Sequence, residues 1–161
     1  MTFKIPLAGA ALALALAGGA NAADLKLTGL DGQAVTLSGA DFAALPHVKL
    51  TVTVEGKTNT YAGVPLASLL AKVGAPQGPA LKGKDLRDVV LVSASDGYSI
   101  VLALAETDPA ERKDQILVAD SADGAPLPAT QAPYRLVVEG DMRGARLARM
   151  VTGIAVQRVG P

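Results

Sequence analysis

The sequence of 161 residues contains no cysteine and no tryptophan, and its only histidine is His47. Without cysteine the chain forms no disulfide and offers no thiolate as a nucleophile or metal ligand. A Ser-His-Asp arrangement would have to use His47, and the Gly-x-Ser-x-Gly motif that exposes a nucleophilic serine is absent. His47 opens a segment of alternating residues, where a histidine is more typical of an edge or core position than of a metal ligand. Apolar packing must therefore stabilise the fold, and hydrolysis is disfavoured.

An excess of either charge is also lacking, because 15 lysines and arginines balance 15 aspartates and glutamates. Neither a nucleic acid nor an anionic membrane surface is indicated as a partner. Aromatic residues make up 3% of the sequence, so the core has to consist mainly of valine, leucine, alanine and isoleucine. The three tyrosines, Tyr61, Tyr98 and Tyr134, each lie in a short motif of their own.

The N-terminus has the three parts of a secretory signal peptide. Lys4 gives a basic start, residues 7–18 form an apolar run rich in alanine and leucine, and the sequence Ala-Asn-Ala ends at Ala22. The alternative is a transmembrane anchor, but the run is shorter than the roughly 20 residues that cross a bilayer. We expect residues 1–22 to be a signal peptide cleaved after Ala22. Residues 23–161 then form a single domain that is periplasmic or secreted.

Alternation of apolar and polar residues predicts that most elements of this domain are strands. The predicted strands are 25–28, 34–37, 47–54, 57–61, 88–95, 98–104, 116–118, 135–139 and 151–159. Short helices are predicted over 40–45, 66–73 and 106–113. The longest irregular stretch is the proline-rich segment 119–133, and long loops in compact domains are often functional. The order of elements predicts a mixed, strand-dominated α+β domain with short helices.

Several motifs follow one another along the chain in a characteristic order. They are Tyr-Ala-Gly-Val-Pro-Leu at 61–66 with Leu-Leu at 69–70, Ala-Ser-Asp-Gly-Tyr at 94–98, Pro-Tyr-Arg-Leu-Val-Val-Glu-Gly-Asp at 133–141, and an arginine-rich segment that enters the last strand at 146–156. In this order and spacing the chain resembles the molybdopterin-binding domain of sulfite-oxidase-type oxidoreductases. The resemblance covers most of residues 23–161 and implies the same strand-dominated fold.

The resemblance also implies a cofactor, because enzymes of that family hold molybdenum through a pterin dithiolene and a cysteine thiolate. This sequence has no cysteine, and Met142 and Met150 are only weak thioether donors. The chain therefore resembles a small exported member that lacks the metal-ligating residue. Molybdenum is not expected as a cofactor, whereas the capacity to hold a pterin is retained.

A pterin is a flat heteroaromatic ring with an amine and an amide edge, so its site needs aromatic or guanidinium faces and a hydrogen-bond acceptor. The candidate site residues are Tyr61, Asp96, Tyr98, Tyr134, Arg143, Arg146 and Arg149. The arginines recur every three residues, a spacing that on a helix or turn would gather them to bind a phosphate or carboxylate tail. Each assignment has a plainer alternative: Asp96 starts a turn, the tyrosines pack in the core, and the arginines pair with Glu139 and Asp141.

We expect the domain to be an exported, non-catalytic binder of a pterin-like small molecule. The resemblance further implies a membrane sensor protein as the partner that responds to occupancy. Two alternatives stay open. The chain could be a degenerate or accessory subunit of a molybdopterin-dependent oxidoreductase, or a protein-interaction domain without a ligand, since arginine is enriched at interfaces.

Overall fold

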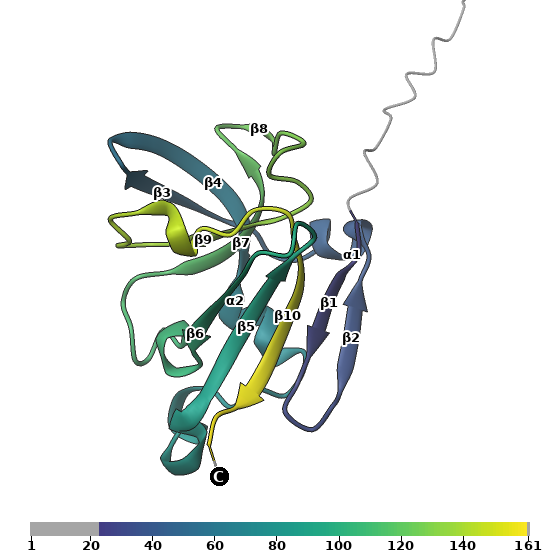
Figure 1. Cartoon of the computed structure of the whole chain (residues 1–161), viewed down its shortest axis with the longest axis vertical. Coiled ribbons are helices and arrows are strands. Elements are labelled where there is room, and N and C mark those ends of the chain that lie inside the picture. The colour runs from purple at the N-terminus through teal and green to yellow at the C-terminus, as the bar shows by residue number, and fades with distance from the viewer. Residues whose placement is uncertain (1–22, 161) are drawn as a thin grey trace, which may run out of the picture.

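The computed structural model of the chain describes residues 23–160, which form two β-sheets and a few short helices (Figure 1). The predicted signal peptide, residues 1–22, lies outside the described residues, and its cleavage after Ala22 stays a prediction. Among the helices of residues 23–160, none is long and apolar enough to cross a membrane. The mixed, strand-dominated α+β architecture that the sequence predicts is confirmed.

The first sheet places the two ends of the domain side by side. Its strand order is β2-β1-β10-β5-β6. The strands are β1 (Leu25–Thr28), β2 (Ala34–Leu37), β5 (Asp88–Ala94), β6 (Ser99–Ala103) and β10 (Val151–Arg158). Only the β1–β10 pair is parallel in this sheet; the other pairs are antiparallel. The C-terminal strand therefore joins the N-terminal hairpin to the β5–β6 hairpin.

The second sheet is antiparallel and is built around β7. Its strands are β3 (Val48–Val54), β4 (Lys57–Pro65), β7 (Ile116–Ala122), β8 (Ala125–Pro126) and β9 (Arg135–Val138). The order is β3-β4-β7-β8, and β9 also pairs with β7. Because β4 pairs with β7 on one side and β9 on the other, β7 is the central strand.

Two short α-helices follow local sequence signals. Helix α1 (Gly39–Ala43) begins after Ser38, whose hydroxyl accepts from the Asp41 N–H at 3.1 Å while the Asp41 carboxylate accepts from the Ser38 N–H at 3.1 Å. This reciprocal cap satisfies two backbone donors that the helix leaves unpaired. Helix α2 (Leu66–Ala71) begins directly after Pro65. The remaining helical turns are 3₁₀: Gly78–Ala80, Gly83–Arg87, Ala105–Thr107 and Gly144–Arg146.

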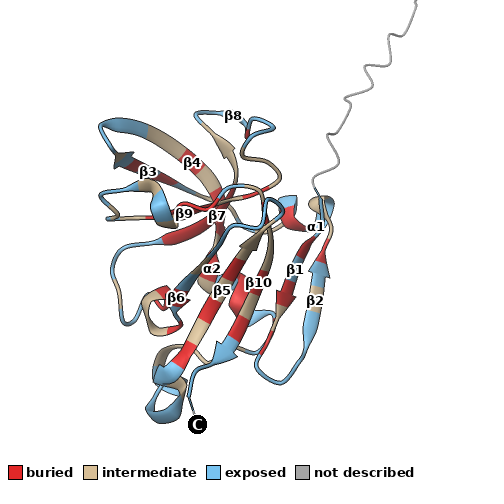
Figure 2. Cartoon of the chain, in the orientation of Figure 1, coloured by how far each residue is buried: buried red, intermediate tan, exposed pale blue. Residues whose placement is uncertain are grey.

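The second sheet has buried residues on both faces, and this arrangement positions the candidate site. The main core unites residues of the first sheet and of α2 with Leu136 and Val138 of β9. Buried residues alternate with less buried ones along β5 and β10 (Figure 2). A smaller apolar cluster forms separately around β3, β4, β7 and β9, and it includes Leu50, Tyr61 and Val137. Successive residues of β9 therefore point alternately into the main core and toward the smaller apolar cluster.

The structure corrects two predictions about local elements. Residues 106–113 do not form the predicted helix, because Asp108 has an extended conformation at ψ 123° directly before Pro109, and a residue before proline avoids the helical region. Part of the segment 119–133 is regular, since β7 continues to Ala122 and turns at Asp123 and Gly124 into β8. The predicted loop is thus partly a hairpin.

Replacing Leu69 by alanine tests the packing of α2 against the main core. Leu69 has no exposed surface, whereas Leu86 is 54% exposed and provides a matched control. We expect Leu69→Ala to lower the free energy of unfolding in urea by about 2–5 kcal/mol, because it removes buried methyl groups and leaves a cavity. Leu86→Ala should change it by no more than about 0.5 kcal/mol. Equal effects of the two substitutions would contradict the burial of α2.

Candidate functional site

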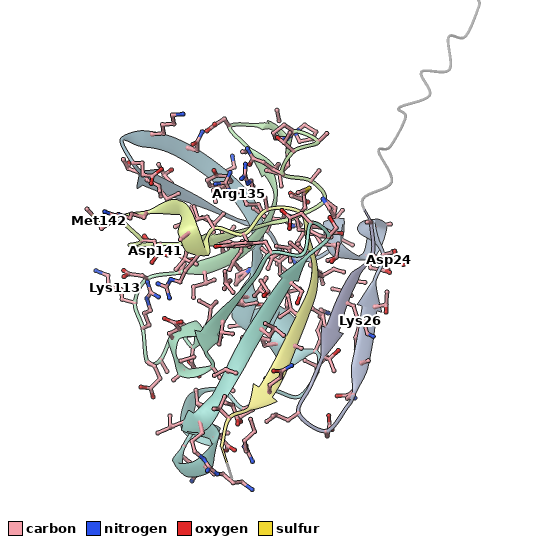
Figure 3. The ribbon with its side chains drawn as sticks, viewed as in Figure 1. Asp24, Lys26, Lys113, Arg135, Asp141 and Met142 are labelled. Carbon is pink, nitrogen blue, oxygen red and sulfur yellow. The ribbon has the colours of Figure 1, made fainter. Side chains whose placement is uncertain are left out.

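A pocket of about 620 Å³ opens between the β3–β4 hairpin, the β7–β8 turn and the segment that follows β9. The polar lining residues are Glu55, Lys57, Asn59, Tyr61, Asp123, Gln131, Arg135 and Arg149. The Arg135 side chain lies between the β3–β4 hairpin and the β7–β8 turn (Figure 3). The volume falls within the range of roughly 300–1,000 Å³ that is usual for small-molecule sites.

The base of the pocket is a stacked pair formed by Tyr61 of β4 and Arg135 of β9. These two strands flank β7, and the β7 residue opposite Arg135 is the fully buried Ala119. The β7 residue opposite Tyr61 is Ala122, and because both alanines have only a methyl group, the two longer side chains can meet across the central strand. The Arg135 Cζ lies 5.2 Å from the centroid of the Tyr61 ring, within the range of a cation–π contact.

A β-bulge after Tyr61 adds to this geometry. The register between β4 and β7 shifts between Ala62 and Gly63. Bulges bend a strand and are frequent next to binding sites. At Gly63 the strands approach so closely that a Cβ would lie 2.2 Å from the Val118 carbonyl oxygen, so no other residue fits there. The Gly-Val-Pro-Leu motif of the sequence thus begins at a position that steric contact restricts to glycine.

Arg135 is a partly desolvated cation without a carboxylate partner. Its Nη1 donates to Gln131 Oε1 at 2.5 Å, but its buried Nε has no hydrogen-bond partner within residues 23–160. Burial lowers the pKa of Arg135, the Tyr61 hydroxyl acts in the opposite direction, and nearby Arg149 lowers it further. Neither arginine forms an ion pair within the described part of the chain. The pocket therefore offers guanidinium groups to an acceptor or an anion.

The β7–β8 turn is fixed to β4 by Asp123. Its Oδ1 accepts from the Thr60 N–H at 2.8 Å, and its Oδ2 accepts from Asn59 Nδ2 at 2.7 Å. Its own N–H donates to the Thr60 carbonyl at 2.7 Å. These hydrogen bonds, the one from Thr60 first, lower the pKa of Asp123 and keep it ionised at neutral pH. The Asp123 carboxylate thus holds the β7–β8 turn, which forms one wall of the pocket, against β4.

The structure divides the candidate residues that the sequence suggested. Tyr61 and Arg149 line the pocket. Asp96 and Tyr98 lie instead at the β5–β6 turn of the first sheet, where Asp96 Oδ1 accepts from the Tyr98 N–H at 2.9 Å, as in the turn interpretation. The Tyr98 hydroxyl donates to the Ala145 carbonyl at 2.7 Å and ties this turn to the segment after β9.

Tyr134 lies in the main core and not in the pocket. It has no exposed surface, and its ring centroid is 4.4 Å from that of Phe42. Its hydroxyl is buried without a hydrogen-bond partner in the described chain. Burial, with Asp120 and Asp24 contributing, raises the pKa of Tyr134 to about 12, because the tyrosinate anion would be desolvated.

The three predicted arginines are not gathered on one side. Arg146 is occupied by ion pairs with Asp141 at 2.5 Å and Glu106 at 3.3 Å, which agrees in part with the surface-pairing alternative. Arg143 is exposed and does not line the pocket, whereas Arg149 does. The spacing of three residues fails to align them because the segment contains only one 3₁₀ turn, at Gly144–Arg146. A role of these residues in ligand binding stays a prediction.

Sequence reasoning missed Asn59, Asp123, Gln131 and Arg135. A signal for Arg135 was present, because it alternates with Leu136 and so must face away from the main core. The other three lie in a strand and in the segment 119–133, and nothing in their local pattern shows that they meet.

The family model of the oxidoreductase molybdopterin-binding domain matches residues 16–159. The chain belongs to this family. The sulfane dehydrogenase SoxCD from Paracoccus pantotrophus is similar in structure, with a TM-score of 0.66, 19% sequence identity and 83% of this chain covered. The chain spans 38% of the length of that dehydrogenase chain. No curated protein matches the chain. The structural likeness supports the fold that the family membership implies.

The residues present fit the organic part of the family's cofactor better than its metal. Within residues 23–160 no three His, Cys, Asp or Glu side chains are placed to hold a metal ion, and the sequence supplies no cysteine. The pocket is lined by two guanidinium groups, side-chain amides, Lys57, the carboxylates of Glu55 and Asp123, and the largely buried Tyr61. These groups suit a flat heterocycle with hydrogen-bonding edges. A thiolate-ligated molybdenum does not fit this chain.

The pH dependence of stability tests the burial of Tyr134. The folded protein keeps the phenol proton up to about pH 12, whereas the unfolded chain releases it near the ordinary tyrosine pKa of 10.0. The contribution of the Tyr134 phenol to stability is therefore fully present below pH 10 and is lost as the pH rises toward 12. We expect Tyr134→Phe to remove this part of the loss in urea unfolding, and Tyr98→Phe to retain it. An unchanged alkaline loss in Tyr134→Phe would show that the phenol is not protected.

Proposed function

We propose that this domain binds a pterin-like heterocycle in the pocket above β4, β7 and β9, and that it does so as an exported, non-catalytic member of its family. The observation that carries the proposal is the Arg135 guanidinium, which lies over the Tyr61 ring, lines the pocket and has no carboxylate partner in the described chain. A partly desolvated cation without an anionic partner is unfavourable, and an acceptor on a ligand would compensate for part of the lost solvation.

The chemistry of a pterin complements these groups. Its ring carbonyl and ring nitrogens are acceptors that suit the guanidinium of Arg135, and its flat surface suits stacking on that planar group. Arg149 and Lys57 line the same pocket, as do Glu55 and Asp123, and the two cations can receive an anionic substituent on the ring. Tyr61 and Arg149 thus keep the binding roles that the sequence suggested, while Arg135 becomes the central residue.

The proposed setting follows from the N-terminus and from the family resemblance. The predicted signal peptide would export residues 23–161, and a membrane sensor protein would respond to their occupancy. Asp96, Tyr98 and Arg143 lie outside the pocket, which makes them available to such a partner. The binding step itself requires neither the sensor nor a metal.

Arginine-to-methionine substitutions test the binding site directly. Residues 23–161 are titrated calorimetrically with oxidised pterin and with tetrahydropterin. We expect Arg135→Met and Arg149→Met to weaken binding, the former by roughly tenfold or more, because a charge-assisted hydrogen bond is lost. Arg143→Met is the matched control on an exposed arginine outside the pocket and should leave binding unchanged. Absence of binding to any pterin up to millimolar concentration would refute the proposal.

Family membership also keeps the accessory-subunit function in consideration, because the chain spans only 38% of the dehydrogenase that it resembles. Metal analysis distinguishes the two functions. We expect protein purified from the cell envelope of its own organism to contain no stoichiometric molybdenum, since the chain has no thiolate to ligate it. Molybdenum at one equivalent would favour the oxidoreductase subunit and would contradict the non-catalytic function.

A further inference from the structure

Asn59 lies on the pocket face of β4. It pairs with Val52 of β3 across the hairpin, and residues that face each other across antiparallel strands share one face. Tyr61 follows two positions later along the strand and so points to the same side. Asn59, Val52 and Tyr61 all line the pocket. The Asn59 amide is therefore placed to contact a ligand in this pocket.

The orientation of this amide is determined by its neighbour. An ionised carboxylate only accepts hydrogen bonds, so Asn59 must turn its NH₂ group toward Asp123. Asp123 cannot rotate away, because its other oxygen accepts from the Thr60 N–H and its backbone sits at φ 52° beside Gly124 in a tight turn. Asn59 Oδ1 is then the acceptor left for the pocket, and it has no hydrogen-bond partner within residues 23–160.

We propose that Asp123 is a positioning residue that sets the hydrogen-bonding polarity of the pocket, so that Asn59 selects a ring whose 2-substituent is an N–H donor. This inference rests on the proposed function and names the ligand edge that the same pocket recognises. It favours a 2-amino-4-oxo heterocycle, whose exocyclic amine donates, over the corresponding 2,4-dioxo heterocycle, whose carbonyl would face Asn59 Oδ1.

The isosteric substitution Asp123→Asn inverts this arrangement. The amide introduced at position 123 still has to accept from the Thr60 N–H with its oxygen, so its NH₂ group replaces Oδ2 and faces Asn59. Two NH₂ groups cannot hydrogen-bond to each other, and Asn59 must rotate its own oxygen toward the new NH₂ group. The pocket then receives an NH₂ group in place of an oxygen. The double substitution Asn59→Asp with Asp123→Asn restores an acceptor in the pocket and keeps the net charge.

The experiment compares pterin with lumazine, which has the same rings but a carbonyl in place of the 2-amino group. Calorimetric titrations use residues 23–161 as the wild type, Asp123→Asn and the double variant. We expect the wild type to prefer pterin by roughly tenfold or more, since a mismatched polar pair in a binding site is costly. The preference should be lost or reversed in Asp123→Asn and should return in the double variant.

The outcomes separate this inference from the proposed function. If the wild type binds pterin and lumazine equally, or if Asp123→Asn keeps the wild-type preference, the positioning role is wrong while pterin binding stands. If the wild type binds neither, the proposed function itself fails. Should Asp123→Asn not fold, the decision rests on the folded double variant, whose recovered preference for pterin supports the inference and whose lack of preference overturns it.

Discussion

The candidate site depends on one constraint, which is that successive side chains of β9 must pack on opposite faces of the second sheet. Leu136 and Val138 enter the main core, so the strand cannot move without loss of buried apolar contacts. Arg135 and Val137, which alternate with them, face the smaller apolar cluster and the pocket. The Arg135 guanidinium is thereby attached to a core strand, and the packing of the core determines its position.

This placement has an electrostatic consequence. A guanidinium that is partly desolvated and has no carboxylate partner in the described chain is unfavourable in the ligand-free protein. The Tyr61 ring and the Gln131 amide compensate only in part. By contrast, Arg146 is satisfied by Asp141 and Glu106, and the buried Asp88 is satisfied by Arg158. Arg135 differs from these charged residues, because it lines the pocket and has no carboxylate partner in the described chain. A ligand in the pocket could supply the missing hydrogen-bond acceptor.

Local sequence signals predicted the elements well, because alternation, caps and turn residues act over a few positions. The Asp-Gly-Tyr motif formed a turn, and Ser38 capped a helix. The division into two sheets and the pocket were not predictable in this way. Asn59 and Asp123 are 64 residues apart, and the Tyr61–Arg135 pair requires knowledge that both strands flank β7. Resemblance to the family supplied the fold, whereas the polar partners of the pocket appeared only in three dimensions.

The central claim is that Arg135 and Tyr61 form the binding surface for a pterin ring. A crystal structure of residues 23–161 grown with pterin tests it most directly. The account predicts the ring against Arg135 on the pocket side of the Tyr61–Arg135 pair, with a ring acceptor within hydrogen-bond distance of the Arg135 guanidinium and the exocyclic amine at Asn59 Oδ1. A pterin bound elsewhere, for example at Tyr98 on the first sheet, with no contact to Arg135, would contradict it.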